Sequence, residues 1–459
     1  MEWDTIAAIS TPIGEGGIGI VRVSGPEAVD IVEKVVESSS GIKIRDFPSH
    51  TLKLCRVKNP DTGEVVDEVM VSVMRAPKTF TREDVVEINC HGGAAPLGAT
   101  LKAVLASGAR LALPGEFSKR AFLNGRIDLA QAEAIIDVIR ARTGKGLSAA
   151  LDHLEGSLSR EIRGIRDDLS GCLARIEVNI DFPGEDPDAE VTTEELGKNL
   201  SRIEKEIEKL LAGAGQGKVL REGLKTVIAG RPNVGKSSLL NALLREKRAI
   251  VTDIPGTTRD VIEEMLNLGG IPVRVLDTAG IRPTRDEVER IGVERSERAL
   301  KEADLVLVIM DASTGLLEED KGVLKKAGEA RCLVVVNKSD LVEKVDIEGW
   351  EKLTSRECVA VSAKTGWGLS SLEEKIRGII EKGEKVREGP LITRVRHEEA
   401  LRKALKHIRE AREACSLGVP EDIIAIDVRE AWTSLGEITG DTASEEIVDR
   451  IFADFCIGK

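Results

Sequence analysis

Gly230-Arg-Pro-Asn-Val-Gly-Lys-Ser237 is the stretch that decides the fold of the central part of this chain. An apolar, strand-like run at 226–229 precedes it, and a helix-like run at 238–244 follows. A glycine-rich turn between a strand and a helix is typical of a phosphate-binding P-loop, in which backbone N–H groups and a helix N-terminus face the phosphates. The pattern predicts a nucleotide site in which Lys236 reaches the outer phosphates and the Ser237 hydroxyl binds Mg²⁺.

A second motif predicts which base is bound. The run at 332–336 is typical of a buried parallel strand, and Asn337-Lys-Ser-Asp340 lies at its carboxyl end, where such sheets bind ligands. A carboxylate at Asp340 accepts hydrogen bonds from the N1–H and N2–H₂ groups of guanine, whereas adenine presents an acceptor at N1. Ser362-Ala-Lys364, after a strand at 359–361, completes the base pocket through its backbone. The predicted ligand is GTP.

Two intervening segments are predicted to sense the γ-phosphate. Asp277, at the end of a strand, would hold Mg²⁺ through water, and Gly280 would offer an N–H group to the phosphate. The polar loop at 252–260 carries threonines, Thr258 among them, that can cap Mg²⁺. Segments of this kind order around Mg²⁺ and the γ-phosphate and relax after hydrolysis. The predicted nucleotide contacts are Asn233, Val234, Gly235, Lys236, Ser237, Ser238, Thr252, Asp253, Ile254, Pro255, Gly256, Thr257, Thr258, Asp277, Thr278, Ala279, Gly280, Asn337, Lys338, Ser339, Asp340, Ser362, Ala363 and Lys364.

One residue expected in a Ras-like enzyme is missing. The glutamine that positions the attacking water follows the Asp-x-x-Gly turn, but this chain has Ile281 there, which cannot orient water. Either hydrolysis is slow, or another group and another source of positive charge do this work. The charged stretch 282–295 contains candidates, each of which is better explained, taken singly, as a solvated helix charge.

Length and composition set bounds on the class of protein. The 459 residues predict two to three domains. The 79 acidic and 66 basic residues give a net charge of −13, which disfavours general electrostatic clamping of nucleic acid. No signal peptide or membrane-spanning apolar run is evident, and the seven cysteines form no C-x-x-C pair. We therefore expect a reduced, cytoplasmic protein that does not bind a membrane.

The expected organisation is a nucleotide-binding domain inserted into a helical one. We expect domains at 1–118, 119–216, 217–382 and 383–459, the second and fourth forming one helical domain around the third. Glycine-rich 213–217 and charged 381–390 are interpreted as linkers. Apolar residues in an eleven-residue period predict one long helix from 147 to 180. Further helices are expected at 196–210, 397–411, 421–435 and 444–455.

Residues 1–118 differ from the helical part, because strand-like runs occur at 18–23, 65–73 and 85–89. Gly14 to Gly19 matches the dinucleotide pattern G-x-G-x-x-G, but a strand follows it instead of a helix, so this interpretation fails. The predicted fold class is a multidomain α/β chain with an α+β N-terminal domain, an all-α domain and an inserted Ras-like, doubly wound α/β G domain.

The motifs together resemble those of the bacterial tRNA modification GTPase MnmE (TrmE) family, from end to end. The resemblance rests on the nucleotide motifs above and on Gly16 to Gly25, Phe80 to Asp84, Pro114 to Gly125 and the terminal Phe455 to Lys459. It implies that residues 1–118 bind 5-formyl- or methylene-tetrahydrofolate and form a homodimer. The implied folate contacts are Arg22, Glu87, Arg126 and Lys459. Cys456 matches a cysteine that the family uses in the modification reaction, and it is equally well explained as a small residue near the chain end.

The resemblance also addresses the missing glutamine. It implies that K⁺, bound by Asn233, Thr252, Ile254 and Thr257, replaces an arginine finger and accompanies dimerisation of the G domains. Mg²⁺ would be bound by Ser237 and Thr258. Glu289 matches the residue that orients the water, and Arg259 is interpreted as structural.

The implied pathway uses an FAD-dependent partner, MnmG (GidA), in a heterotetramer. Together they install a carboxymethylaminomethyl or aminomethyl group on C5 of the wobble uridine of tRNA, with the amine from glycine or ammonium. Two alternatives stay open at this point. One is a regulatory GTPase for ribosome assembly that binds RNA without modifying it, and the other is a folate-dependent aminomethyltransferase related to the glycine-cleavage T-protein.

Overall fold

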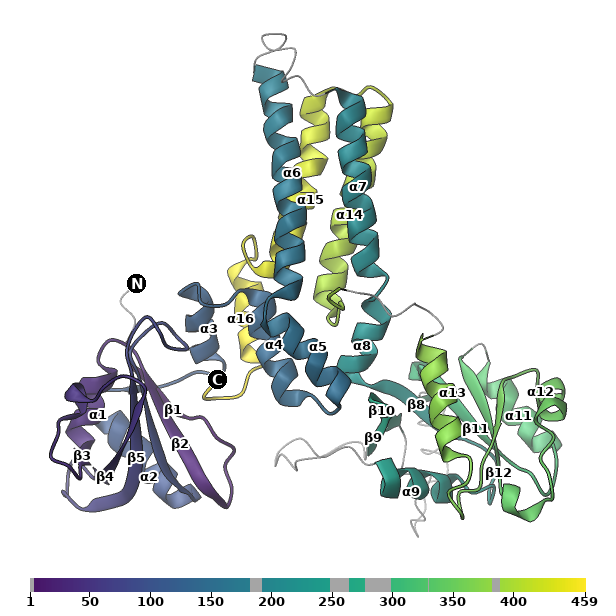
Figure 1. Ribbon diagram of the computed structural model, residues 1–459, viewed down its shortest axis with the longest axis horizontal. Coiled ribbons are helices and arrows are strands. Elements are labelled where there is room, and N and C mark those ends of the chain that lie inside the picture. Colours follow the sequence, from purple (N-terminus) through teal and green to yellow (C-terminus); the bar gives the residue numbers. More distant parts are fainter. Residues whose placement is uncertain (1–3, 182–191, 248–263, 277–298, 329, 382–388) are drawn as a thin grey trace. The chain divides into compact units, whose positions relative to one another are not determined.

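The chain divides into two compact units that do not follow the order of the sequence. The computed structural model describes residues 4–181, 192–247, 264–276, 299–328, 330–381 and 389–459. The first unit combines residues 1–136 with 436–459, and the second consists of residues 137–435. Figure 1 shows the elements of both units. Because the first unit contains both ends of the chain, residues far apart in sequence can form one site there.

The first unit is built on a mixed sheet. In its described residues, seven strands pair in the order β3-β4-β5-β6-β2-β1-β7, all antiparallel except β1 with β7. The strands are β1 (Ile6–Ile9), β2 (Gly16–Ser24), β3 (Val36–Ser38), β4 (Thr51–Lys58), β5 (Val65–Met74), β6 (Val85–Gly92) and β7 (Arg110–Leu111). Alternate residues such as Val69, Val71 and Val73 face a core shared with α1 (Ala28–Val35) and α2 (Ala94–Ala106). The glycine run at 14–19 leads into β2, as the sequence predicts.

A smaller helical part of the first unit packs the C-terminal residues against α3 and α4. It contains α3 (Glu116–Leu123), the start of α4 (Leu129–Arg140) and α16 (Glu445–Ala453). Leu129, Phe452 and Phe455 share one core, in which the two phenylalanine rings lie 5.2 Å apart. The backbone N–H of Gly115 donates to the carbonyl oxygen of Cys456 at 3.4 Å. The C-terminal residues are therefore seated on the start of α3.

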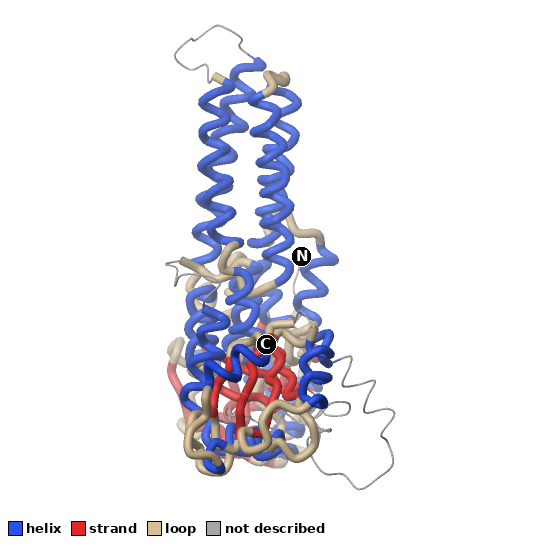
Figure 2. Tube along the Cα trace, turned by 90° about the vertical axis from the view of Figure 1, so that its right-hand side faces the viewer, coloured by secondary structure: helices blue, strands red, loops and turns tan. Residues whose placement is uncertain are grey.

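The second unit contains a bundle of long helices, which Figure 2 shows side by side. They are α6 (Ser157–Asp181), α7 (Thr193–Leu211), α14 (Val395–Ser416) and α15 (Glu421–Thr439), with the shorter α5 (Gly144–Leu154) and α8 (Ala214–Glu222). Leu200 and Ile203 of α7, and Leu401 and Ile408 of α14, are buried within it. Each long helix therefore buries one apolar stripe.

Two expectations about these helices are wrong. The predicted single helix from 147 to 180 is broken into α5 and α6 at Gly156, whose φ is +81°, because a residue in the left-handed region ends a helix. The glycine-rich stretch 213–217, interpreted as a linker, mostly belongs to α8. Here tertiary packing outweighs the low helix propensity of glycine.

The rest of the second unit is the predicted doubly wound part, and we call residues 224–381 the G domain. In its described residues, six strands pair in the order β13-β12-β11-β8-β10-β9, all parallel except β9 with β10. The strands are β8 (Leu224–Ala229), β9 (Glu264–Leu268), β10 (Ile271–Leu276), β11 (Leu305–Asp311), β12 (Cys332–Asn337) and β13 (Cys358–Ala360). The helices include α9 (Lys236–Lys247), α11 (Glu318–Ala327), α12 (Ile347–Thr354) and α13 (Leu369–Glu381). Every residue of β11 is buried, as expected for a central parallel strand.

The predicted fold class is confirmed: an α+β N-terminal part, an all-α part and a doubly wound α/β part. None of the helices in the described ranges is both long enough and apolar enough to cross a membrane.

Candidate functional site

The P-loop connects β8 to α9, and two of its glycines are required by their surroundings. Gly230 has a φ of +154°, and a Cβ there would lie 2.6 Å from the carbonyl oxygen of Ile309. Gly235 has a φ of +98°, and a Cβ there would lie 2.2 Å from the Nδ2 atom of Asn337. Both positions combine a left-handed backbone with a close approach, so only glycine fits.

The loop is wrapped around the side chain of Lys236. Its Nζ atom donates hydrogen bonds to the carbonyl oxygens of Gly230, at 2.7 Å, and Arg231, at 2.9 Å. Burial lowers the pKa of the Lys236 ammonium. A cation that is partly desolvated and, among the described residues, bonded to neutral carbonyls gains free energy when an anion approaches, so the geometry suits a phosphate.

Two further P-loop residues were predicted to contact cations. Ser237 lies in the first turn of α9, where its hydroxyl can reach a cation bound beside the phosphates. Asn233 is exposed and has a φ of +64°, a left-handed conformation that asparagine adopts more readily than most residues.

Asn337 joins three of the predicted motifs through one buried side chain. Its Nδ2 atom donates to the carbonyl oxygen of Val234 in the P-loop at 2.9 Å. Its Oδ1 atom accepts from the backbone N–H of Ala363 at 3.0 Å. Since the side chain is only 2% exposed, both hydrogen bonds are shielded from water. The P-loop and the two segments predicted to recognise the base are therefore held together by this side chain.

The remaining base-site residues are oriented by neighbouring strands. Lys338 forms an ion pair of 2.7 Å with Asp311, at the end of β11. Asp340 is exposed, and its Oδ1 atom accepts a hydrogen bond of 2.7 Å from the hydroxyl of Ser362. This bond orients the carboxylate at the carboxyl edge of the sheet, where the sequence predicts contact with guanine.

Sequence reasoning missed a set of residues that hold the P-loop from outside. The guanidinium of Arg231 donates to the hydroxyl of Thr314 and forms an ion pair of 3.4 Å with Asp320 in α11. The side chain of Asp320 is almost fully buried. No spacing in the sequence connects these positions, because they meet only when α11 packs against the sheet.

Several predicted nucleotide and cation contacts lie outside the described residues. They are Thr252, Asp253, Ile254, Pro255, Gly256, Thr257, Thr258, Asp277, Thr278, Ala279, Gly280 and Glu289. Ile281 and Arg259 also fall in these ranges.

A second site in the first unit gathers three of the four predicted folate residues. Arg22 in β2 lies directly opposite Glu87 in β6. The Nε and Nη2 atoms of Arg22 are 2.9 and 2.8 Å from the same carboxylate oxygen of Glu87. Its guanidinium also lies over the ring of Phe117, 5.7 Å from the centroid. The arginine is thus held from two sides.

The C-terminal tail completes this group. Arg22 Nη1 donates to the carbonyl oxygen of Gly458 at 3.4 Å. Burial, followed by the nearby charge of Arg22, lowers the pKa of the Lys459 side chain. Cys456 is exposed in the same tail. Within the described residues no hydrogen bond or ion pair joins Arg126 to the group, and this residue lies exposed just after α3.

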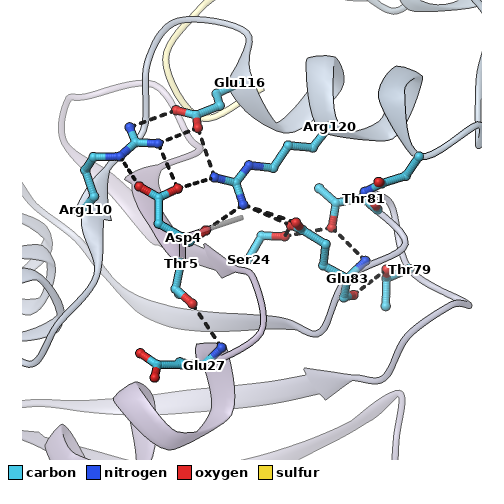
Figure 3. Close-up of polar contacts among 11 residues, drawn as sticks. Asp4, Thr5, Ser24, Glu27, Thr79, Thr81, Glu83, Arg110, Glu116 and Arg120 are labelled. Carbon is cyan, nitrogen blue, oxygen red and sulfur yellow. Dashed lines mark hydrogen bonds and ion pairs between the residues drawn. The ribbon is translucent and has the colours of Figure 1, made fainter. Parts of the chain in front are cut away.

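A buried charge network supports the helix beneath Arg22. Arg120 of α3 is fully buried and forms ion pairs with Asp4 (2.9 Å), Glu83 (3.1 Å) and Glu116 (3.0 Å). Arg110 contacts Asp4 and Glu116 from the other side, at 2.6 and 2.7 Å, as Figure 3 shows. The hydrogen bond from Arg110 is the largest influence that lowers the pKa of Asp4, to about 2. Since Phe117 follows Glu116 directly, this network places the ring under Arg22.

Known protein families match this chain over the regions that contain both sites. The family description "GTP-binding protein TrmE N-terminus" matches residues 5–126, and "MnmE helical domain" matches residues 129–456. A tRNA modification GTPase MnmE from Geobacillus thermodenitrificans is 53% identical over 461 residues, which cover 100% of each chain. Proteins of the same name from Heliobacterium modesticaldum and Moorella thermoacetica are 53% and 52% identical and cover at least 99% of each chain.

Proposed function

Since this chain belongs to the MnmE family of tRNA modification GTPases, we propose that it uses GTP hydrolysis to drive folate-dependent modification of the tRNA wobble uridine. The product would carry a carboxymethylaminomethyl or aminomethyl group on C5. One observation carries the proposal beyond the family name: Arg22, Glu87 and the C-terminal Lys459 meet in one unit.

The chemistry of this group suits a tetrahydrofolate. Folate has hydrogen-bond donors on its pterin ring and carboxylates on its glutamate tail. Glu87 accepts from donors, whereas Arg22 and Lys459 bind carboxylates. Arg22 and Lys459 would each offer a cation to a carboxylate of the ligand. Arg126, which is exposed near the end of α3, would contact the outer part of the ligand. Cys456 would act in the reaction itself.

GTP hydrolysis would follow from the P-loop geometry. Lys236 and the N-terminus of α9 bind the phosphates, and Ser237 with Thr258 would hold Mg²⁺, which stabilises the charge that develops on the phosphate oxygens. Asn233 would bind K⁺ together with Thr252, Ile254 and Thr257, in place of an arginine finger. Glu289 would orient the attacking water.

The partners follow from the same proposal. The chain would form a homodimer through residues 1–118 and a heterotetramer with the FAD-dependent MnmG in the cytoplasm, with tRNA as substrate. The functional boundaries would be 1–118 for folate binding, 217–382 for GTP hydrolysis, and 119–216 with 383–459 for the helical domain.

A mass-spectrometric assay tests the proposal. Transfer RNA from cells that lack the modification is incubated with the full-length protein, GTP, KCl and a tetrahydrofolate donor, with and without the flavoprotein. We expect the wobble-uridine adduct only when both proteins and folate are present. GTP turnover without an adduct, and without any binding of folate to the isolated protein, would favour the regulatory GTPase that binds RNA.

A further inference from the structure

One carboxylate in the helical bundle contacts the chain at both ends of the G domain. Asp137 in α4 accepts a hydrogen bond of 3.2 Å from Nε of Arg221, which lies in α8 just before the first strand of the G domain. It also accepts from Nη2 and Nε of Arg394, at 2.8 and 3.2 Å. Arg394 directly precedes α14, after the chain has left the G domain. The linkers are α8 and residues 389–394, which precede and follow the G domain, and we call Asp137, Arg221 and Arg394 the linker clamp.

Two of the three side chains of the linker clamp are largely shielded from water. The side chains of Asp137 and Arg394 are 12% and 13% exposed, and that of Arg221 is 28% exposed. Charge-assisted hydrogen bonds in such surroundings are stronger than exposed ion pairs. Loss of the carboxylate would remove an anion that both guanidinium groups contact, while Arg221 would keep its ion pair of 3.3 Å with Glu222. The two linkers are thus held together by an interaction that is costly to break.

A second carboxylate in the same bundle is similarly paired but connects different segments. Glu204 in α7 is 9% exposed and forms ion pairs of 2.8 Å with Arg409 and Arg412, both in α14. The burial of this carboxylate and its distances to two arginines resemble those of Asp137, although its arginine partners are more exposed, at 51% and 48%. However, Glu204 joins only two bundle helices, whereas Asp137 joins the segments that enter and leave the G domain. The first arrangement stabilises the bundle, and the second also couples it to the inserted domain.

We propose that Asp137 is a positioning residue that passes the nucleotide state of the G domain to the rest of the chain. This inference rests on the proposed function, in which GTP hydrolysis drives modification. When switching between GTP and GDP displaces one linker, the shared carboxylate forces the other linker and α4 to move with it. The same helix begins in the first unit, where Leu129 packs with Phe452 and Phe455. Those phenylalanines immediately precede the tail that carries Lys459.

The test compares Asp137→Asn with the matched control Glu204→Gln in the full-length protein. We expect both variants to hydrolyse GTP at the wild-type rate, because neither residue belongs to the nucleotide site. The number of tRNA molecules modified per GTP hydrolysed should fall by about fivefold or more in Asp137→Asn, within the usual range of coupling between sites, and stay unchanged in Glu204→Gln.

Hydrogen exchange gives a readout that needs no modification activity. In the wild type and in Glu204→Gln, replacing GDP by a non-hydrolysable GTP analogue should change exchange protection in residues 129–140 and 391–400. In Asp137→Asn this change should disappear. Equal behaviour of Asp137→Asn and Glu204→Gln in both assays would overturn the proposal. If the wild type does not modify tRNA, the proposed function fails, and hydrogen exchange alone decides on the linker clamp.

A second variant covers the case in which Asp137→Asn does not fold. Arg221→Gln leaves the carboxylate paired with Arg394, so the bundle keeps a neutralised charge while one linker is released. We expect this variant to fold and to lose the nucleotide-dependent exchange at 391–400. Retention of the wild-type response in Arg221→Gln would contradict the coupling role.

Discussion

Arg22, near the start of the chain, donates a hydrogen bond of 3.4 Å to the carbonyl oxygen of Gly458, the residue before the last. The same guanidinium is bonded to Glu87 and lies over Phe117. Because Arg22 is held by three different segments, its position depends on the whole first unit being folded. Arg22 is therefore well placed to bind a ligand that contacts both β2 and the C-terminal tail.

Replacement of Arg22 by alanine should abolish most folate binding without affecting GTP. A hydrogen-bonded charge is worth about 1.5–3 kcal/mol, so we expect the dissociation constant for 5-formyl-tetrahydrofolate to rise by about tenfold or more. Isothermal titration calorimetry measures both ligands. Arg56→Ala is the matched control, since Arg56 forms a cross-strand pair with Glu68 on the same sheet but is well exposed. Equal losses in the two variants would speak against the assigned site.

Folate affinity should decrease at alkaline pH. Burial and the charge of Arg22 lower the pKa of Lys459 in the free protein. A bound carboxylate would raise that pKa, so binding takes up a proton, and affinity is lost as the pH rises through the pKa of the free protein. Calorimetry in two buffers of different ionisation enthalpy should show this uptake in the wild type and not in Lys459→Gln. A pH-independent affinity would remove Lys459 from the site.

Replacement of one carboxylate oxygen of Asp340 by an amide nitrogen should change the base specificity. Asp340→Asn replaces one of the two acceptor oxygens by a donor, so guanine loses the contact to its N2–H₂ group, and xanthine, which has a carbonyl at C2, gains one. We expect the affinity for GTP to fall by about tenfold to a hundredfold and the affinity for xanthosine triphosphate to rise. Competition against a fluorescent nucleotide measures both. Asp346→Asn, at the start of α12, is the control.

Removal of Arg120 should destabilise the first unit. Arg120→Met leaves Asp4 and Glu116 paired with Arg110 in the network of Figure 3 but removes the guanidinium that Glu83 contacts, and breaking a buried ion pair in this way costs about 3–5 kcal/mol. Urea unfolding followed by circular dichroism measures the loss. The exposed pair between Arg402 and Glu398 in α14 provides the control, because Arg402→Met should change stability little.

The same network predicts acid sensitivity. The pKa of Asp4 is about 2 in the folded protein, below its value in an unfolded chain of about 3.9. The stabilisation is therefore complete above the unfolded value and is lost as the pH falls from about 4 toward 2. In Asp4→Asn the unfolding free energy should vary less over this interval, and an unchanged dependence would assign the acid sensitivity to other groups.

GTP hydrolysis should be faster in KCl than in NaCl at matched ionic strength. The exposed Asn233, whose backbone is held in the left-handed region, is the proposed K⁺ ligand in the described part of the P-loop. Asn233→Ala should therefore remove most of the difference between the two salts while GTP still binds. A phosphate-release assay measures the rates. Equal rates of the wild type in both salts would contradict the proposal that Asn233 binds K⁺.

The parts that sequence reasoning predicted correctly are local. The P-loop, the motif 337–340 and the segment 362–364 each combine an apolar strand with a fixed polar turn, and the structure confirms the strand before each. The break at Gly156 was missed because the apolar period continues across it. The helix at 214–222 was missed because its packing outweighs its glycine content.

The parts that it missed depend on distant contacts. Arg231 meets Asp320 only through the packing of α11, and Arg120 meets Asp4 and Glu83 only through the folding of the first unit. In the sequence, nothing distinguishes these residues from the other charged residues of the chain.

The sequence by itself was enough to predict a GTP site in this protein. Phosphate and guanine are recognised by short segments, and the residues within each segment fix its backbone geometry. Only the tertiary structure decided which charges act together. It seated Gly458 against Arg22 and placed both linkers of the G domain on Asp137, because an ion pair is set by distance in space and not by separation along the chain.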